Sequence, residues 1–128
     1  FVSNSTAHNR YPVHAFGALK DKNQQPVVKQ YIPYFAGALK QAVQQEDSIK
    51  IRTMTLALGN LAHPKILDVF EPYLEGQKPM TQFQRLTVVA SLRKLAQLYP
   101  KVARPVLFSI YQNTGEATEV RVAAFYAL

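Results

Sequence analysis

The chain has 128 residues, 48% of them hydrophobic, and its 15 lysines and arginines against 8 acidic residues give a net charge of +7. This length can bury a core within one domain. The lack of cysteine excludes disulfides, and no apolar run approaches the ~20 residues that span a bilayer. The basic residues are spread along the chain, which permits contact with nucleic acid, anionic lipid or an acidic protein but does not indicate a basic tail.

Residues 1–25 are the least regular part of the sequence. Turn-forming and polar residues interrupt short apolar pieces, residues 13–19 are interpreted as the end of an earlier helix, and residues 21–25 as a solvated connection. Asn4 begins an Asn-Ser-Thr sequon, which is the acceptor pattern for N-linked glycans in secreted proteins. We therefore interpret residues 1–25 as an irregular lead-in and Asn4 as a candidate glycosylation site.

A first helix pair is predicted over residues 26–60. Apolar residues at three- and four-residue steps predict a helix from Pro26 to about residue 45, and they are Val28, Tyr31, Ile32, Phe35, Leu39 and Val43. Asp47-Ser48 supplies an N-cap for the second helix. That helix is expected to end where Gly59-Asn60 offers left-handed backbone and His63 is forced into an extended conformation by Pro64.

A second pair is predicted over residues 64–98. Pro64 fits the first turn of a short helix that ends at Gly76, with a stripe of Ile66, Val69, Phe70, Tyr73 and Leu74. Thr81 and Gln84 have the spacing of a capping box. They are expected to begin the longest helix, with apolar residues Phe83, Leu86, Val88, Val89, Ala90, Leu92, Leu95 and Ala96. If Leu86 is fully buried between pairs, Leu86→Ala should cost roughly 2–5 kcal/mol.

A third pair is predicted over residues 100–128. Pro100 opens its first helix, residues 113–115 form a turn, and Glu116 and Glu119 favour the first turn of the last helix through the macrodipole. The apolar spacing continues to Leu128 without a stop signal. We therefore interpret the chain as a fragment and expect further structure to cover Ala124, Phe125 and Leu128.

The three predicted pairs repeat one unit. Their opening prolines, Pro26, Pro64 and Pro100, lie 38 and 36 residues apart, and three base-plus-aliphatic pairs recur at intervals of 35 and 36 residues. The latter are Lys50-Ile51, Arg85-Leu86 and Arg121-Val122. Pro33, Pro72 and Pro105 fall inside the first helix of each pair and predict bends there. Periods of this size are typical of an α-solenoid of the HEAT-like kind, so the predicted fold is all-α.

Candidate catalytic and metal-binding residues are few. The three histidines and eight carboxylates form no His-x-x-x-His, Glu-x-x-His or cysteine pattern, and neither a nucleophile elbow nor a phosphate-binding glycine loop is present. His63 is interpreted as a helix-ending residue before Pro64. We expect no enzyme, no metal and no cofactor.

Five basic residues lie in consecutive predicted helices and could converge on one edge of the stack. They are Arg85, Arg93, Lys94, Lys101 and Arg104. Solvated faces and ion pairs between stacked helices are the favoured interpretation, each pair contributing at most about 1 kcal/mol when exposed. The alternative is contact with an anionic surface. Membrane is favoured over nucleic acid because the aromatic residues occupy positions expected in the core rather than on a stacking platform.

Several segments resemble the helical domain of vitellogenins, within the large lipid transfer protein family, and in detail those of insects. The resemblance covers essentially the whole chain from about Tyr11. The segments that carry it are Ala57-Leu58-Gly59-Asn60 with His63-Pro64, then Phe70-Glu71-Pro72-Tyr73-Leu74-Glu75-Gly76, Tyr99-Pro100-Lys101-Val102 and Glu119-Val120-Arg121-Val122-Ala123-Ala124-Phe125. The resemblance implies a two-layer right-handed superhelix around the lipid-filled β-sheets of a secreted lipoprotein. It also implies that lipid is held mainly by those sheets, and that receptor contacts lie in an amino-terminal barrel.

The leading functional hypothesis is therefore a scaffold segment of a secreted protein that carries lipid and stores yolk nutrients. Its partners would be lipids, the sheets and barrel of the same parent chain and, through other regions, a vitellogenin receptor. The alternative hypothesis is a helical-repeat interaction module whose basic surface binds anionic membranes or, less favoured, nucleic acid.

Overall fold

The computed structural model describes residues 25–128, and every regular element in that range is helical, which confirms the predicted all-α class. The first group of elements comprises α2 (Gln25–Val28), the 3₁₀ turn η3 (Lys29–Tyr31), α3 (Ile32–Gln44) and α4 (Ser48–Leu61). The second comprises α5 (Ile66–Leu74), α6 (Gln82–Ser91) and α7 (Arg93–Leu98). The third comprises α8 (Pro100–Gln112) and α9 (Thr118–Ala127). The predictions for residues 1–24, including the helix end over residues 13–19 and Asn4, lie outside the described residues.

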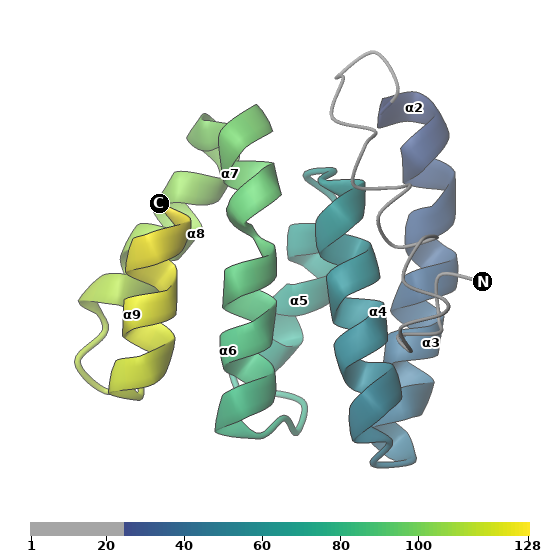
Figure 1. Cartoon of the computed structure of the whole chain (residues 1–128), viewed down its shortest axis with the longest axis horizontal. Coiled ribbons are helices and arrows are strands. Elements are labelled where there is room, and N and C mark those ends of the chain that lie inside the picture. Colours follow the sequence, from purple (N-terminus) through teal and green to yellow (C-terminus); the bar gives the residue numbers. More distant parts are fainter. Residues whose placement is uncertain (1–24) are drawn as a thin grey trace.

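The helices form two layers in chain order (Figure 1). In one layer α4, α6 and α9 lie side by side and pack directly on one another, α4 against α6 and α6 against α9. The other layer contains α3, α5 and α8, with α3 packed on α4 and α8 on α9. This arrangement confirms a helical repeat whose successive pairs are neighbours in space.

The core follows the predicted stripes with local exceptions. Its buried hydrophobic residues form one continuous cluster that includes Val28, Ile32, Phe35, Leu39, Met54, Leu58, Phe70, Val89, Leu95, Leu107 and Val120. Tyr31 was expected in the stripe but is exposed. It is the last residue of the 3₁₀ turn η3. Phe83, at the start of α6, is also exposed rather than buried.

Leu86 is only partly buried, at the edge of the core. The condition for a loss of roughly 2–5 kcal/mol on truncation to alanine is therefore not met. We expect a smaller loss for this substitution.

The predicted caps at the helix ends are confirmed. The Asp47 carboxylate accepts the backbone N–H of Lys50 at 3.1 Å at the start of α4. The Thr81 hydroxyl accepts the Gln84 N–H at 3.1 Å, and the Gln84 side chain accepts the Thr81 N–H at 3.0 Å, which completes a capping box. After α5, Gly76 adopts φ +80° and the next N–H bonds back to the carbonyl of Pro72 at 2.9 Å, as in a Schellman motif.

The predicted stop at Gly59-Asn60 is wrong by two residues. Both residues belong to α4, which continues to Leu61, and the left-handed residue is Ala62 with φ 50°. Gly59 instead allows α4 and α6 to approach closely, because a Cβ built at this position would lie 2.6 Å from the Ser91 carbonyl oxygen and 2.7 Å from its Cβ. The glycine is required by packing between pairs rather than by the end of the helix.

The helix predicted to be the longest is divided. α6 ends at Ser91 and α7 begins at Arg93. At the junction the Leu92 N–H bonds to the carbonyl of Val89, three residues back, at 3.1 Å, and the Ser91 hydroxyl donates to the Val88 carbonyl at 2.6 Å. Such side-chain bonding to a preceding carbonyl bends helices. Because the predicted helix is divided here, the 14-residue α4 is the longest helix in the described part of the chain.

The prolines behave less uniformly than their spacing predicted. Pro33 follows the 3₁₀ turn that interrupts the first helix, whereas α5 and α8 pass through Pro72 and Pro105 as unbroken α-helices. Pro64 was expected in the first turn of its helix but precedes α5, where its carbonyl accepts the Leu67 N–H at 3.1 Å. Pro100 opens α8 at its first position, as predicted.

His63 organises the connection between α4 and α5. Its Nδ1 accepts the backbone N–H of Lys65 at 3.0 Å, which requires that this nitrogen carry no proton. Burial, followed by the positive charges of Lys29 and Lys65, lowers the pKa of His63 below the ordinary histidine value. The folded chain therefore favours neutral His63.

We expect Gly59→Ala to destabilise the fold by about 1–3 kcal/mol, because the added methyl group overlaps the Ser91 backbone. Chemical denaturation followed by circular dichroism measures the loss. Gly37→Ala is the matched control: Gly37 lies within α3 and an added Cβ there meets nothing within 4 Å. This control should gain about 0.5–1 kcal/mol from helix propensity. Equal effects of the two substitutions would contradict a close crossing at Gly59.

We expect the stability of the chain to fall as the pH is lowered from about 7 to 5, in part through His63. Because its folded pKa is lowered, the unfolded chain binds a proton first as pH falls through about 6.5, and stability is lost until the folded group also protonates. His63→Asn keeps an acceptor for the Lys65 N–H without the titration. Thermal unfolding at several pH values should show a smaller dependence in this variant, and an unchanged slope would refute the assignment.

Candidate functional site

The features of residues 25–128 that can carry function are surfaces. No group of three or more histidines or acidic residues in this range is placed to hold a metal ion. The hollows are open grooves between neighbouring helices: α4 and α6 line one, α5 and α8 another, and residues of α3, α4 and α6 a third. Among the described helices, none has the length and apolar character needed to cross a membrane.

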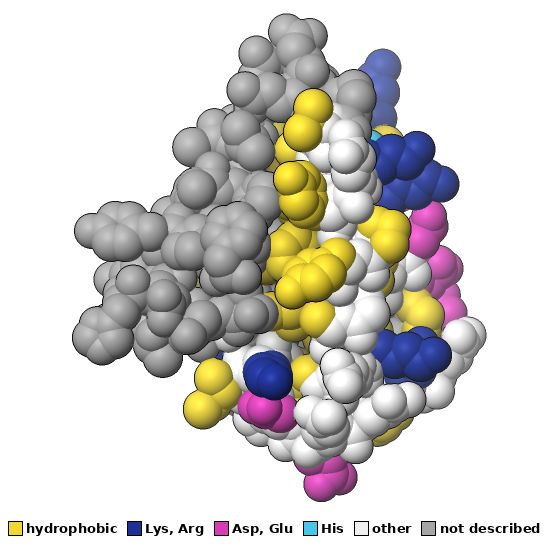
Figure 2. All heavy atoms as spheres, turned by 90° about the vertical axis from the view of Figure 1, so that its right-hand side faces the viewer, with side chains coloured by type: hydrophobic (Ala, Val, Ile, Leu, Met, Phe, Trp, Pro, Cys, Tyr) yellow, Lys and Arg dark blue, Asp and Glu magenta, His cyan; other side chains and the backbone are white. Residues whose placement is uncertain are grey.

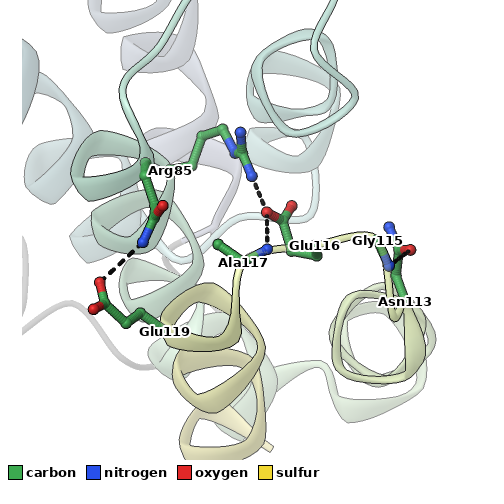
Figure 3. A network of polar contacts seen from close by, with 7 residues as sticks. Arg85, Asn113, Gly115, Glu116, Ala117 and Glu119 are labelled. Carbon is green, nitrogen blue, oxygen red and sulfur yellow. Dashed lines mark hydrogen bonds and ion pairs between the residues drawn. The ribbon is translucent and has the colours of Figure 1, made fainter.

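Two of the five candidate basic residues make polar contacts between helices. Arg85 on α6 is ion-paired with Glu116, whose side chain is 11% exposed, and Glu116 also accepts the Ala117 N–H at 2.8 Å just before α9 (Figure 3). Lys94 on α7 donates to the side-chain oxygen of Asn60 on α4. Arg85 and Lys94 therefore form polar contacts within the helix stack, as the favoured interpretation of the basic residues predicted.

A second polar contact lies beside the Arg85 pair and also joins α6 to α9. The Gln82 side chain donates to the Glu119 carboxylate at 3.0 Å (Figure 3). Glu119 occupies the first turn of α9, as predicted, whereas Glu116 precedes that helix. The two contacts fix the start of the last helix against the start of α6.

The other three candidate residues gather at the opposite end of α9. Arg93 and Arg104 line one hollow together with Tyr126 and Leu128. Lys101 and Arg104 line the adjoining surface with Leu128. All three basic residues are exposed. Arg104 thus borders both hollows, one with Arg93 and the other with Lys101, whereas Arg85 and Lys94 line neither of them.

Next to these bases, α8 and α9 carry an exposed aromatic cluster that we call the end face, made of Phe108, Tyr111, Phe125 and Tyr126. Successive rings contact one another, with centroid separations of 6.3, 5.7 and 5.5 Å from Phe108 to Tyr126. Phe125 is 55% and Tyr126 is 76% exposed. The general assignment of aromatic residues to the core is therefore wrong for this cluster.

The repeat register explains the exposure of Phe125 in the end face. Met54 in α4, Val89 in α6 and Phe125 in α9 occupy equivalent positions, 35 and 36 residues apart. Met54 and Val89 are 1% and 0% exposed, and each belongs to a helix that has a following helix of the same layer beside it. Another set of equivalent residues shows the same trend along the stack: Ile51 is buried, Leu86 is partly buried and Val122 is exposed. Phe125 and Val122 thus lie on the surface that a following pair covers earlier in the stack.

The first helical segment exposes apolar side chains as well. Val27, Tyr31 and Tyr34 are exposed at a spacing that places them along one side of a helix. Figure 2, which looks at the α3 side of the stack, shows a column of hydrophobic side chains, with uncharged polar side chains and backbone to its right and charged side chains beyond them. Both ends of the described stack therefore present apolar surface.

Sequence comparison relates the chain to a known family. The chain matches the family described as the vitellogenin TPR domain over residues 1–128. It is 48% identical to Vitellogenin-1 of Solenopsis invicta, 48% to Vitellogenin-A1 of Aedes aegypti and 45% to a vitellogenin of Anthonomus grandis, over 98%, 99% and 100% of the chain. It spans only 8%, 6% and 7% of those proteins. No solved structure matches the chain.

Proposed function

The chain belongs to the family of the vitellogenin TPR domain, and on that premise we propose that its helix pairs form a section of wall around the lipid of a secreted yolk lipoprotein. In this role the segment carries out no chemistry. It supports lipid transport and nutrient storage by the parent protein, whose other regions hold the lipid and contact a receptor.

The observation that carries this proposal is the repeated surface at Met54, Val89 and Phe125. A solenoid unit buries its apolar face only against a neighbour, and this face is buried twice and then exposed. A wall built of such units offers the same surface to whatever part of the parent protein lies next in the stack. Continuous packing from pair to pair also keeps such a wall closed to water.

Secretion is part of the proposal, and Asn4 is its glycan acceptor. An Asn-Ser-Thr sequon is modified only in a protein that passes through the secretory pathway.

We expect the purified parent protein to release lipid on extraction with organic solvent, and its lipid content to depend on the packing of the helix pairs. Gly59→Trp forces α4 away from α6 and should lower the lipid bound per protein molecule, whereas Gly37→Ala should leave it unchanged. Lipid is quantified by mass spectrometry. A parent protein without lipid refutes the proposal. Unchanged lipid in a Gly59→Trp variant whose α4 and α6 amides exchange faster with solvent refutes the enclosing role.

A second candidate function rests on the grouping of Arg93, Lys101 and Arg104 beside exposed apolar residues. These bases would hold the stack against an anionic membrane, with Phe108 and Tyr126 at the headgroup level. This is the narrower form of the interaction-module hypothesis, because Arg85 and Lys94 are engaged within the stack. Nucleic acid is less favoured because the exposed rings contact one another and leave fewer free faces for bases.

For this second function we expect the chain to bind vesicles containing anionic lipid at low salt and to dissociate as salt rises. Replacing Arg93, Lys101 and Arg104 by glutamine should abolish sedimentation with the vesicles. The matched control replaces Lys40, Lys50 and Arg52, three exposed bases on α3 and α4, and should have little effect. No binding at low salt, or equal losses in both triple variants, would reject this function, and a DNA-binding assay under the same conditions separates membrane from nucleic acid.

A further inference from the structure

We call the layer of α3, α5 and α8 the outer layer and that of α4, α6 and α9 the inner layer. A groove of about 620 Å³ runs between α5 and α8 in the outer layer. It exists because α5 packs on α6 and α8 packs on α7 and α9, while α5 and α8 make little contact with each other. Its apolar lining consists of Leu67 and Leu74 from α5 and Pro105, Val106 and Ile110 from α8. The volume lies within the range of about 300–1,000 Å³ that is usual for binding pockets.

The charges along this groove are all of one sign. Its charged lining residues are Glu71, Glu75 and Glu116, in a chain whose net charge is +7. Glu116 is neutralised by Arg85, but the ion pairs of the described residues, Lys65–Asp68 and Arg85–Glu116, involve neither Glu71 nor Glu75. Glu75 accepts only a neutral donor, the Gln77 amide at 3.2 Å.

Glu71 and Glu75 are also poorly placed with respect to each other. Glu71 lies on α5 and Glu75, four residues later, is its C-cap. Like charges at this spacing face one another on the helix surface and destabilise it. A cation bound between them relieves this repulsion, and apolar groups on the same ligand cover the half-exposed leucines. Anionic membranes and nucleic acid, in contrast, are repelled by these carboxylates.

We propose that the α5–α8 groove binds a basic amphipathic helix of a partner protein, with its apolar face on Leu67, Leu74 and Ile110 and its lysines or arginines at Glu71 and Glu75. The nine residues of α5 extend about 13 Å at 1.5 Å per residue, which matches roughly two turns of a docked helix. Recognition is of the helix-in-groove kind, in which apolar anchors provide contact and charges fix orientation. The inference is independent of lipid carriage, and its failure leaves the proposed wall untouched.

The test uses the intact chain and three synthetic helical peptides in which leucine alternates at helical spacing with lysine, glutamate or serine. Fluorescence anisotropy should show binding of the leucine–lysine peptide at low salt and much weaker binding of the other two. The double variant Glu71→Gln/Glu75→Gln should lower the affinity for the leucine–lysine peptide by about five- to tenfold, as expected for the loss of two exposed ion pairs. Glu46→Gln/Glu119→Gln removes two carboxylates outside the groove and should leave affinity nearly unchanged.

A second variant examines the apolar part without deleting any core residue. Ser109 is exposed on α8 and lines the groove, so Ser109→Trp should fill the groove and block the peptide. Gln112→Trp, on the same helix but outside the lining, should not. Circular dichroism verifies that all variants remain helical. The proposal is overturned if the lysine peptide does not bind, if the serine or glutamate peptide binds equally well, or if neither groove variant weakens binding more than its control.

Discussion

The close crossing of α4 and α6 is the contact on which the stack depends. A solenoid pair cannot bury its apolar face alone, so the distance between successive inner helices decides whether Met54, Leu58 and Val89 leave water together. At Gly59 the absence of a side chain lets the Ser91 backbone approach to a separation that no Cβ would permit. The bond from Lys94 to Asn60 lies one residue beyond this point. Apolar packing and one polar contact thus act at the same place, and the division of α6 from α7 at Leu92 lies beside it.

Beyond this crossing, the two layers differ in how tightly their helices associate. The inner layer is continuous, since α4, α6 and α9 pack in sequence, and the contacts from Arg85 to Glu116 and from Gln82 to Glu119 fix the last of these helices in register. In the outer layer, α5 and α8 contact the inner helices more than each other. The outer layer therefore has an open groove between α5 and α8, and the inner layer has a smaller one between the first turns of α4 and α6.

The surfaces of the stack fall into chemically distinct regions. The end face is aromatic and borders Arg93, Lys101 and Arg104. The α5–α8 groove is apolar and carries Glu71 and Glu75, which take part in no ion pair of the described residues. Opposite charges at separate places suit different partners, because a cationic region attracts anionic surfaces and an acidic groove repels them. A single net charge of +7 averages over this difference and therefore describes neither region.

The sequence by itself determined the helical class, the repeat and most helix ends, because these depend on local chemistry. The hydroxyl of Thr81 and the flexible backbone of Gly76 act within four residues of their own positions. Tertiary structure alone decided the rest. It showed that Gly59 allows the close approach of α4 and α6 rather than ending α4, and that Tyr31 and Phe83 face solvent. It also showed that, of the five candidate basic residues, Arg93, Lys101 and Arg104 border adjoining hollows. The same periodicity buries Met54 and exposes Phe125. Burial depends on whether another helix lies alongside, and that information is not contained in the spacing of residues along one helix.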